Sequence, residues 1–368
     1  MSTNYLRGST DGFIGRRTSF QRYLVCALEG YFPVLVRTGE NSLAVIFRSG
    51  ATHVGISGTL STSISENGGI SWSDPIAVTP RWNDDRNPAL GVNRRGELIA
   101  AFWRAGAQAY PMAEDGSGRH YQPAKGKELE VAATYITRSG DAGAHWSTPQ
   151  LYRSELINLA SPYGRIVAEA DGTLLMNLYG SLRGAPDGSP DITVLCRSRD
   201  DGQTWGDESV IAEGYNETAL LPLADGTLLA ACRSTSGLIA LTRSNDGGGR
   251  SWTEPKAVTR IGEHPADLTL LQSGRVLLSY GRRIRPYGAG LLYLGKTGTG
   301  ADYSREVLLA GDGILNQDLG YPSTVQLADG HIVTVLYYAC GSAMSQHFGG
   351  WGDVSCQAIH YHEADLAL

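Results

Sequence analysis

The stretch Ser198-Arg199-Asp200-Asp201-Gly202-Gln203-Thr204-Trp205 decides the fold, because near copies of it recur along the chain. The copies lie at 65–72, 139–146 and 244–252, the last with one inserted glycine. In such a segment the Asp or Asn side chain accepts bonds from backbone amides, the glycine takes a positive φ, and the tryptophan packs against the neighbouring unit. We therefore predict tight hairpin turns that serve folding and lie far from any chemistry.

A second pattern alternates with these turns: an apolar strand, a turn that contains glycine, and another apolar strand. It occurs six times, at 31–48, 86–104, 162–183, 217–233, 264–283 and 321–338. Glycine accounts for 47 of 368 residues, and the apolar runs are too short for a helical domain, so the protein is predicted to be all-β. Six four-stranded antiparallel units of about 50 residues predict a six-bladed β-propeller formed by one domain.

We place the six blades at about 31–80, 86–155, 160–212, 216–260, 264–310 and 320–363. The strand around 18–28 is expected to close the ring beside the C-terminal strand.

The charges exclude several classes of partner. The 31 basic and 37 acidic residues give a net charge of −6, and no Lys/Arg-rich tract is present, so no nucleic-acid partner is expected. No apolar run approaches the roughly 20 residues of a membrane span, so no membrane partner is expected either. The N-terminal residues lack an apolar signal core, which predicts a cytoplasmic protein, or a secreted or periplasmic one whose leader was removed.

The cysteines give no sign of a metal site. There are five, at 26, 196, 232, 340 and 356, and none has the spacing of a ligand pair. We predict buried reduced thiols, with a bridge between Cys340 and Cys356 as the alternative, and neither a metal nor a cofactor.

The symmetry of the inner hairpins predicts which residues meet. Glu217 and Arg233 lie eight positions on either side of Asp225, so the two ends should face each other. The same construction pairs Arg86 with Arg104, His264 with Arg283, Tyr31 with Arg48, and Tyr321 with Tyr338. Because the innermost hairpins of a propeller surround its channel, all such ends should converge on one face. The substrate-binding residues predicted there are Arg48, Arg86, Arg104, Arg233, Arg283, Tyr31, His264 and Tyr338.

That face gathers five arginines against one carboxylate, Glu217, on a protein that is acidic overall. Guanidinium groups bind carboxylates through two parallel hydrogen bonds, so the predicted partner is a small anion, most simply an acidic glycan. The alternative is that several of these arginines form salt bridges with structural carboxylates between blades.

The repeated boxes and the order of the units resemble the sialidase (neuraminidase) superfamily of Asp-box, or BNR-repeat, propellers. Two segments carry the resemblance further: 216–233, which begins Asn216-Glu217-Thr218, and 320–330, which begins Gly320-Tyr321-Pro322. The resemblance implies a retaining glycosidase whose nucleophile is Tyr321, with Glu217 as the base that removes the phenolic proton. A neutral nucleophile suits sialic acid, because the carboxylate on its anomeric carbon would repel an anion. Otherwise Tyr321 simply packs its ring before a proline.

Two departures from the family pattern affect the predicted chemistry. Tyr31-Phe32-Pro33 stands where sialidases have Arg-Ile-Pro, so one carboxylate-binding arginine is missing, and Arg48 or Arg86 is its candidate replacement. The loop 49–59 lacks the acid/base Asp of the family, and its only titratable group is His53, which could act as acid/base near neutrality. Asp84 and Asp85 are the nearest carboxylates that could take that role instead; otherwise they belong to a solvated loop.

Three functions remain open from the sequence. The first is a retaining exo-α-sialidase. The second is a lyase or glycosidase that acts on a uronic acid with His53, His264 and Tyr321 as proton-transfer groups. The third is a non-catalytic carbohydrate-binding propeller. Two insertions, 105–130 and 340–356, carry aromatic and histidine side chains and are either walls of the substrate pocket or simple surface loops.

Overall fold

Short apolar segments between glycine turns form strands throughout the part of the chain that the structure describes. The computed structural model describes residues 4–5, 16–17, 20–80, 82–112, 122, 132–186, 188–294, 306–311, 314, 317–339 and 354–366. Within these ranges the helical segments are the 3₁₀ turn Ala107–Ala109 and α2, Glu363–Leu366. No helix in the described part has the length and apolar character that crossing a bilayer requires.

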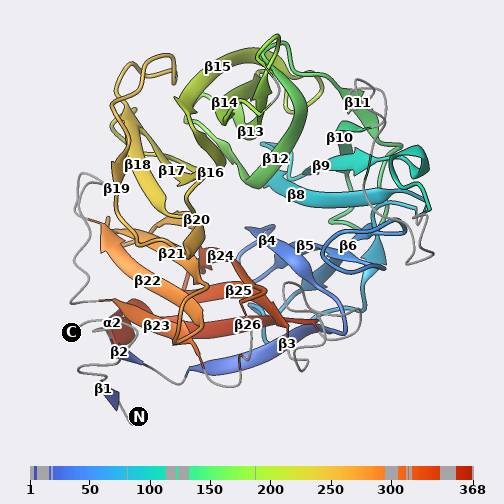
Figure 1. Cartoon of the computed structure of the whole chain (residues 1–368). Helices are drawn as coiled ribbons and strands as arrows, with labels where there is room; N and C mark the ends of the chain where they lie inside the picture. The colour runs from blue at the N-terminus through green and yellow to red at the C-terminus, as the bar shows by residue number, and fades with distance from the viewer. Residues whose placement is uncertain are drawn as a thin grey trace.

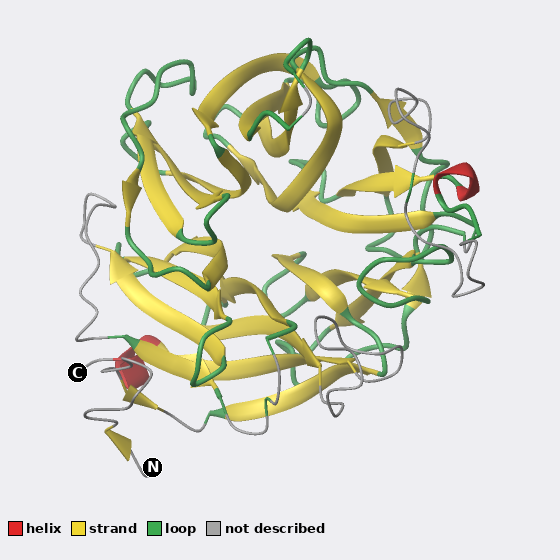
Figure 2. Ribbon diagram, viewed as in Figure 1, coloured by secondary structure: helices red, strands yellow, loops and turns green. Residues whose placement is uncertain are grey.

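The strands form five hydrogen-bonded sheets that are arranged in a ring (Figures 1 and 2). Three sheets have four strands. One contains β4 (Tyr31–Arg37), β5 (Leu43–Ser49), β6 (Thr59–Ser65) and β7 (Ile76–Ala77). The next contains β16 (Tyr215–Pro222), β17 (Leu228–Ser234), β18 (Ile239–Ser244) and β19 (Lys256–Ala257). The third contains β24 (Leu319–Gln326), β25 (His331–Ala339), β26 (Val354–His362) and β3 (Gln21–Ala27).

The other two sheets are larger. The eight-stranded sheet combines β8 (Asp84–Val92), β9 (Leu98–Ala105), β10 (Ala132–Ser139) and β11 (Gln150–Tyr152) with β12 (Ile157–Ala168), β13 (Leu174–Leu182), β14 (Asp191–Ser198) and β15 (Gly206–Glu213). The six-stranded sheet contains β20 (Glu263–Leu270), β21 (Val276–Arg282), β22 (Gly288–Leu294) and β23 (Val307–Ala310), extended by β2 (Arg16–Arg17) and β1 (Asn4–Tyr5).

The predicted all-β class and the propeller-like arrangement of antiparallel four-stranded sheets are confirmed, but six separate sheets are not found in the described part of the chain. A short parallel pairing joins β8 to β12, through Ala89 with Gly164 and Leu90 with Arg165. Gly91 permits this approach, because a Cβ at that position would lie 2.6 Å from Cβ of Ile166. Two antiparallel groups of four strands therefore merge into one sheet.

Apolar side chains pack between neighbouring sheets, and the predicted turns cap these layers. In the box 139–146, Ser139 Oγ accepts a bond from the Gly143 amide at 2.8 Å and Asp141 Oδ1 accepts one from the His145 amide at 2.9 Å. The Trp146 indole donates to the Gly143 carbonyl at 3.2 Å and packs against a cluster that includes Leu98 and Val34. These segments, which we call the Asp boxes (65–72, 139–146, 198–205 and 244–252), form local turns as predicted.

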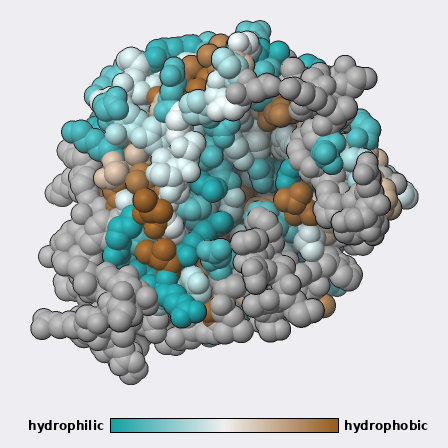
Figure 3. Space-filling view, in the orientation of Figure 1, coloured by the Kyte–Doolittle hydropathy of each residue, from teal (hydrophilic) through white to brown (hydrophobic). Residues whose placement is uncertain are grey.

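The ring closes where the first long strand meets the last. β3 pairs antiparallel with β26, and Cys26 lies opposite Cys356 in that pairing (Figure 1). Cys26, Cys196, Cys232 and Cys356 are buried free thiols. Cys340 lies outside the described residues. The face seen in Figure 3 carries hydrophilic side chains around its middle, with small hydrophobic patches at the rim.

Candidate functional site

The first strands of the antiparallel groups surround the axis of the ring. β4, β8, β12, β16, β20 and β24 contact one another in this order, and β24 returns to β4. Each pairs with its hairpin partner through a register shift near its own beginning, and these shifts fall at Tyr31/Val34, Arg86/Ala89, Asn158/Ser161, Tyr215/Thr218, Glu263/Ala266 and Gly320/Ser323. We call the end of the ring where these strands begin the mouth.

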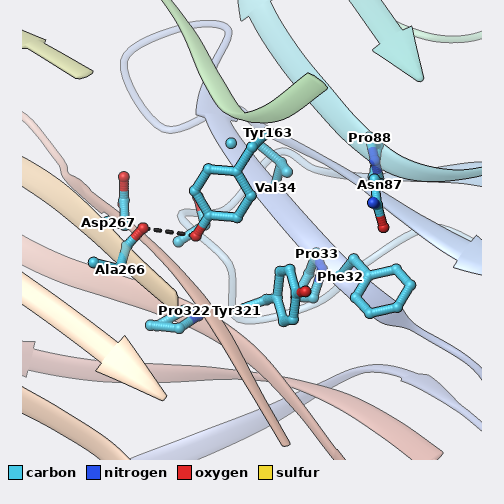
Figure 4. A pocket seen from close by; sticks show the side chains of 12 residues that line it. Phe32, Pro33, Val34, Asn87, Pro88, Tyr163, Ala266, Asp267, Tyr321 and Pro322 are labelled. Carbon is cyan, nitrogen blue, oxygen red and sulfur yellow. Dashed lines mark hydrogen bonds between the residues drawn. The ribbon is translucent and has the colours of Figure 1, made fainter. Parts of the chain in front are cut away.

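The bulges at the mouth redirect side chains that a regular strand would place elsewhere. Phe32, Asn87, Leu159 and Tyr321 have positive φ values of 54°, 51°, 51° and 50°. Residues other than glycine rarely adopt this region, and such conformations concentrate at functional sites. Figure 4 shows Phe32, Asn87 and Tyr321 around one pocket. The pocket's cavity of about 10 Å³ has space for roughly one water molecule, so these side chains form a nearly closed floor.

The predicted nucleophile and base meet at the mouth. The Tyr321 hydroxyl donates a hydrogen bond to Glu217 Oε1, and Arg233 Nη1 donates to Glu217 Oε2. Glu217 is 3% exposed and Tyr321 is 8% exposed. Burial raises the pKa of Tyr321 well above its ordinary value, and the negative charge of Glu217 raises it further. The phenol is therefore protonated, and its proton already points at a carboxylate.

Buried nitrogen atoms without hydrogen-bond partners among the described residues lie around this pair. The Arg283 guanidinium carbon is 5.8 Å from the centre of the Tyr321 ring. Arg283 Nε and Nη2, Arg233 Nε and His264 Nδ1 are buried atoms with no hydrogen-bond partner among the described residues. Burial lowers the pKa of His264 to about 2, and the charges of Arg233 and Arg283 lower it further. His264 is therefore neutral beside two arginines.

His53 reaches the same region from the loop after β5. Its ring packs edge-on against Phe32, with centroids 4.7 Å apart, and Phe32 lies 4.7 Å from the Tyr321 ring. His53 Nδ1 is 3.2 Å from Asp318 Oδ1. Burial lowers the pKa of His53; the Asp318 carboxylate opposes that shift, whereas Arg283 and Arg48 add to it. The structure thus brings His53 into the same region as the predicted nucleophile, with Phe32 in contact with both rings.

Arg48, Asp84 and their neighbours form a paired cluster instead of an open anion site. Arg48 is fully buried and donates to Asp84 Oδ1, to the Asp85 carbonyl at 2.6 Å, and to two loop carbonyls. Arg104 holds Asp85 through two bonds, at 2.6 and 2.8 Å. Both aspartates are 0% exposed, so they do not belong to a solvated loop. These arginines match the alternative in which guanidinium groups neutralise structural carboxylates.

Of the other predicted binding residues, Arg86 lies beside a carboxylate and an aromatic ring, whereas Tyr31 and Tyr338 pack among other side chains. Arg86 Nε is 3.4 Å from Asp84 Oδ2, and its guanidinium carbon lies 4.2 Å from the centre of the Trp103 ring. Tyr31 is 1% exposed and packs against His53 at 5.8 Å. Tyr338 packs with Ile314 and Leu319. The bulge in β24 pairs Tyr338 with Leu319, so the expected pairing of Tyr338 with Tyr321 is wrong, and Tyr337 contacts Tyr321 instead.

The same shift affects two other predicted pairs. Arg104 pairs with Asp85 rather than with Arg86, and Arg282 rather than Arg283 faces β20, opposite Glu263. In β8 the bulge alone accounts for the difference, because the ladder beyond it would pair Arg86 with Arg104. In β20 and β24 that ladder is already one residue from the predicted count, and the bulge adds a second residue.

Three further residues at the mouth, Asn87, Tyr163 and Asp318, are not among those predicted from the sequence. Asn87 Nδ2 donates to Ser161 Oγ at 3.0 Å and to the Tyr179 hydroxyl at 2.8 Å, which ties β8 to β12 and β13. The Tyr163 hydroxyl donates to the Ala266 carbonyl at 2.6 Å across the pocket (Figure 4). Asp318 is the third, and its position three residues before Tyr321 is the signal that could have identified it.

Other features of the predicted site fall partly outside the described residues. Most of the insertions 105–130 and 340–356 lies outside the described residues, so their predicted role as pocket walls stays a prediction. Within the described residues, no group of three or more His, Cys, Asp or Glu side chains could hold a metal ion.

Comparisons with known proteins place this geometry in a fold family. The sequence profile of the BNR repeat-like domain matches residues 86–334. No curated protein sequence matches the chain. A solved structure of a protein of unknown function from Dyadobacter fermentans is similar, with 22% identity, a TM-score of 0.74, and coverage of 93% of this chain and 98% of that one.

Two sialidase structures are also similar. For the NanB sialidase of Streptococcus pneumoniae, the identity is 16% and the TM-score 0.68, with 95% of this chain and 71% of that chain covered. For the intramolecular trans-sialidase of Ruminococcus gnavus, the identity is 14% and the TM-score 0.68, with 95% and 98% covered. At these identities the likeness establishes a common fold.

Proposed function

The chain belongs to the BNR repeat-like domain family and to the sialidase-like superfamily, and we propose that it is a glycoside hydrolase that releases a terminal anionic sugar. The specific reaction we propose is that of a retaining exo-α-sialidase. We also interpret the ring as one domain of six blades, in which β8–β11 and β12–β15 are two blades joined by their short parallel pairing.

The observation that carries the proposal is the chain of contacts from Tyr321 through Glu217 to Arg233, beside the unpartnered nitrogens of Arg283. A buried guanidinium nitrogen without a partner costs free energy, and a ligand carboxylate would supply the missing acceptor. The charge of the ligand and the reacting phenol would then lie side by side, as cleavage next to a sugar carboxylate requires.

The proposed reaction has two balanced steps. In the first, Tyr321 Oη forms a bond to the anomeric carbon as the glycosidic C–O bond breaks; the phenolic proton moves to Glu217 Oε1, and His53 gives a proton to the departing oxygen. In the second, water attacks the anomeric carbon, His53 takes a proton from that water, and the tyrosyl oxygen recovers its proton from Glu217. The two inversions leave the anomeric configuration unchanged.

Not all of the sequence-predicted residues keep their roles in this proposal. We assign the substrate carboxylate to Arg233 and Arg283, with His264 next to them. Arg48 instead anchors the loop that carries His53, through bonds to the carbonyls of Thr52 at 2.9 Å and Gly55 at 3.0 Å. Asp85 is not retained as the acid, because Arg104 occupies both of its oxygens.

A second candidate function is a lyase or glycosidase directed at a uronic acid. It is favoured by His53, because the lowered pKa of this imidazole keeps it neutral, and therefore able to accept a proton, at neutral pH. The arginines would then neutralise the uronate.

Product analysis separates these functions. The protein is incubated with sialosides and, separately, with uronate-containing oligosaccharides, and the products are identified by chromatography and ultraviolet absorbance. Free sialic acid is expected. An unsaturated uronate with no sialic acid would replace the proposal with the lyase, and binding of a glycan without any product would indicate a carbohydrate-binding propeller.

A further inference from the structure

Asp318 lies at the mouth in a position that the reaction above does not use. Its Oδ1 atom is 3.2 Å from His53 Nδ1 and accepts a hydrogen bond from the Tyr337 hydroxyl at 2.8 Å. Asp318 is 3% exposed and Tyr337 is 0% exposed. The backbone carbonyl of Asp318 also accepts a bond from the Ala339 amide at 3.0 Å. The carboxylate is therefore held from two directions, and it faces one particular ring nitrogen.

The histidine is also held by two aromatic rings and by its loop. Phe32 packs edge-on against its ring at an angle of 87°, and Tyr31 packs at 74° with centroids 5.8 Å apart. Arg48 binds loop carbonyls on both sides of His53 in the sequence, those of Thr52 and Gly55. A side chain fixed in this way cannot rotate freely, which favours one tautomer and one orientation.

Asp318 is also coupled in space to the predicted nucleophile. It immediately precedes β24, three residues before Tyr321. Phe32 contacts both His53 and Tyr321, with centroid distances of 4.7 Å in each case, and Tyr337 packs against Tyr321 at 5.9 Å. The imidazole, its carboxylate partner and the phenol therefore form one packed group.

We propose that Asp318 is a positioning residue that holds the Nδ1–H of His53, so that Nε2 transfers the proton to and from the glycosidic oxygen. This inference rests on the glycosidase proposed above. In the first step the proton on Nε2 moves to the leaving oxygen as the C–O bond breaks. In the second step Nε2 takes a proton from the attacking water. Asp318 remains ionised throughout and stabilises the imidazolium form of His53.

The charges around His53 determine in which direction its pKa should shift when Asp318 loses its charge. Asp318, before β24, favours the protonated imidazole, whereas burial, Arg283 after β21 and Arg48 on β5 oppose it. The phenol groups of Tyr31 and Tyr337 also pack nearby, and they are uncharged at neutral pH. Removing the negative charge at position 318 leaves only groups that oppose protonation. The pKa of His53 must then fall further below its ordinary value.

The experiment compares Asp318→Asn with Tyr337→Phe. Asn keeps the size of the side chain but removes its charge, whereas Tyr337→Phe removes one bond to Asp318 and keeps that charge. NMR titration of the His53 ring, without substrate, is expected to show a lower pKa in Asp318→Asn and a pKa that is unchanged or higher in Tyr337→Phe. An unchanged His53 pKa in Asp318→Asn would overturn the proposal.

Kinetics supply a second readout. Asp318→Asn is expected to slow sialosides with poor leaving groups by roughly 10²-fold, at the lower end of general acid catalysis, with little effect on aryl sialosides that need no proton. In a His53→Ala background the same change should add nothing, because the group it orients is gone. Equal slowing of both substrate types, or an additive effect in the His53→Ala background, would show that Asp318 is merely structural.

The two proposals fail in different ways. If Tyr321→Phe abolishes turnover while Asp318→Asn changes neither the His53 pKa nor the leaving-group dependence, the glycosidase stands and the role of Asp318 is wrong. If Tyr321→Phe retains full turnover, the proposed glycosidase mechanism is wrong, whatever the titration of His53 shows.

Discussion

The Asp boxes and the mouth differ in how completely their polar side chains are hydrogen-bonded within the protein. In the box 139–146, Ser139, Asp141 and Trp146 all have hydrogen-bond partners within the turn. At the mouth, nitrogens of Arg233, Arg283 and His264 are buried and have no partner among the described residues. An unsatisfied buried polar group costs about 1–3 kcal/mol, so the gathering of several such nitrogens at the mouth calls for an explanation, and a bound ligand would complete their bonding. The mouth therefore differs from the box 139–146 in having donors available to a ligand.

One box departs from the other three and gives this comparison an internal control. The indoles of Trp72, Trp146 and Trp252 donate to glycine carbonyls at 3.0, 3.2 and 3.1 Å. The indole nitrogen of Trp205 is buried with no partner in the described part of the chain. The box 198–205 therefore has the same sequence pattern with one bond fewer.

The largest effect is expected from Tyr321→Phe, which removes the predicted nucleophilic oxygen and little else. Turnover should fall by roughly 10³-fold or more for every substrate, because attack at the anomeric carbon is needed whatever group leaves. Tyr361→Phe is the matched control: this tyrosine is also buried, and its hydroxyl bonds Thr334. Steady-state kinetics should show normal turnover for the control. Comparable losses in both variants would mean that Tyr321 is structural.

The next effect concerns pH. Because the pKa of His53 is lowered, it carries the proton needed for acid catalysis only below a pH that is itself lower than 6.5. Rates for sialosides with poor leaving groups should therefore fall as the pH rises through that value, and His53→Ala should remove this limb with a loss of roughly 10²–10⁴-fold. Aryl sialosides should lack the limb in both proteins. A pH profile that is identical for both substrate types would exclude His53 as the acid.

A third prediction separates affinity from stability. Arg283→Met removes unpartnered buried nitrogens, so the protein should become more stable or keep its stability while the KM for an acidic sugar rises strongly. Arg197→Met is the matched control, because Arg197 is 3% exposed and its guanidinium donates to the Asp207 carbonyl, to Ser209 Oγ and to two glycine carbonyls.

The control should lose stability by about 1.5–3 kcal/mol per hydrogen bond that is not replaced, and it should keep its KM. Urea unfolding and kinetics measure the two quantities. If Arg283→Met destabilises the protein as much as Arg197→Met does, the contrast between the two regions is wrong.

The smallest expected effect is on the free energy of unfolding, in variants of the tryptophans of the Asp boxes. Trp146→Phe loses an indole bond and Trp205→Phe does not, although both lose the same volume. The free energy of unfolding should therefore fall by about 1 kcal/mol more in Trp146→Phe, and neither variant should change catalytic constants. Equal losses in urea titrations would show that the indole bond contributes nothing.

Local patterns predicted the parts of the fold that depend on local geometry. The boxes and the glycine turns follow from sequence because their bonds join residues a few positions apart. The meeting of Glu217 with Arg233 followed from the symmetry of one hairpin, and the structure does place an ion pair there.

The rest depended on bulges and on pairing across blades. The register of β24 with β25 could not be counted from the turn. Ser323 pairs with Val335, which brings Tyr337 rather than Tyr338 to Tyr321, and the bond from Tyr337 to Asp318 depends on that register. The sequence shows how many arginines the chain has, but it does not show which of them are neutralised. That depends on Asp84 and Asp85, which become buried only when β8 packs against the loop after β5.

The most direct test of the central claim is to trap the glycosyl-enzyme. A 3-fluorosialosyl fluoride carries a good leaving group, while its second fluorine slows hydrolysis of the intermediate, so the sugar should accumulate on the nucleophile. Peptide mass spectrometry is expected to find the sugar on Tyr321 in the wild-type protein and no adduct in Tyr321→Phe. An adduct on another residue, or release of sialic acid by the wild-type protein with no adduct formed, would contradict the account.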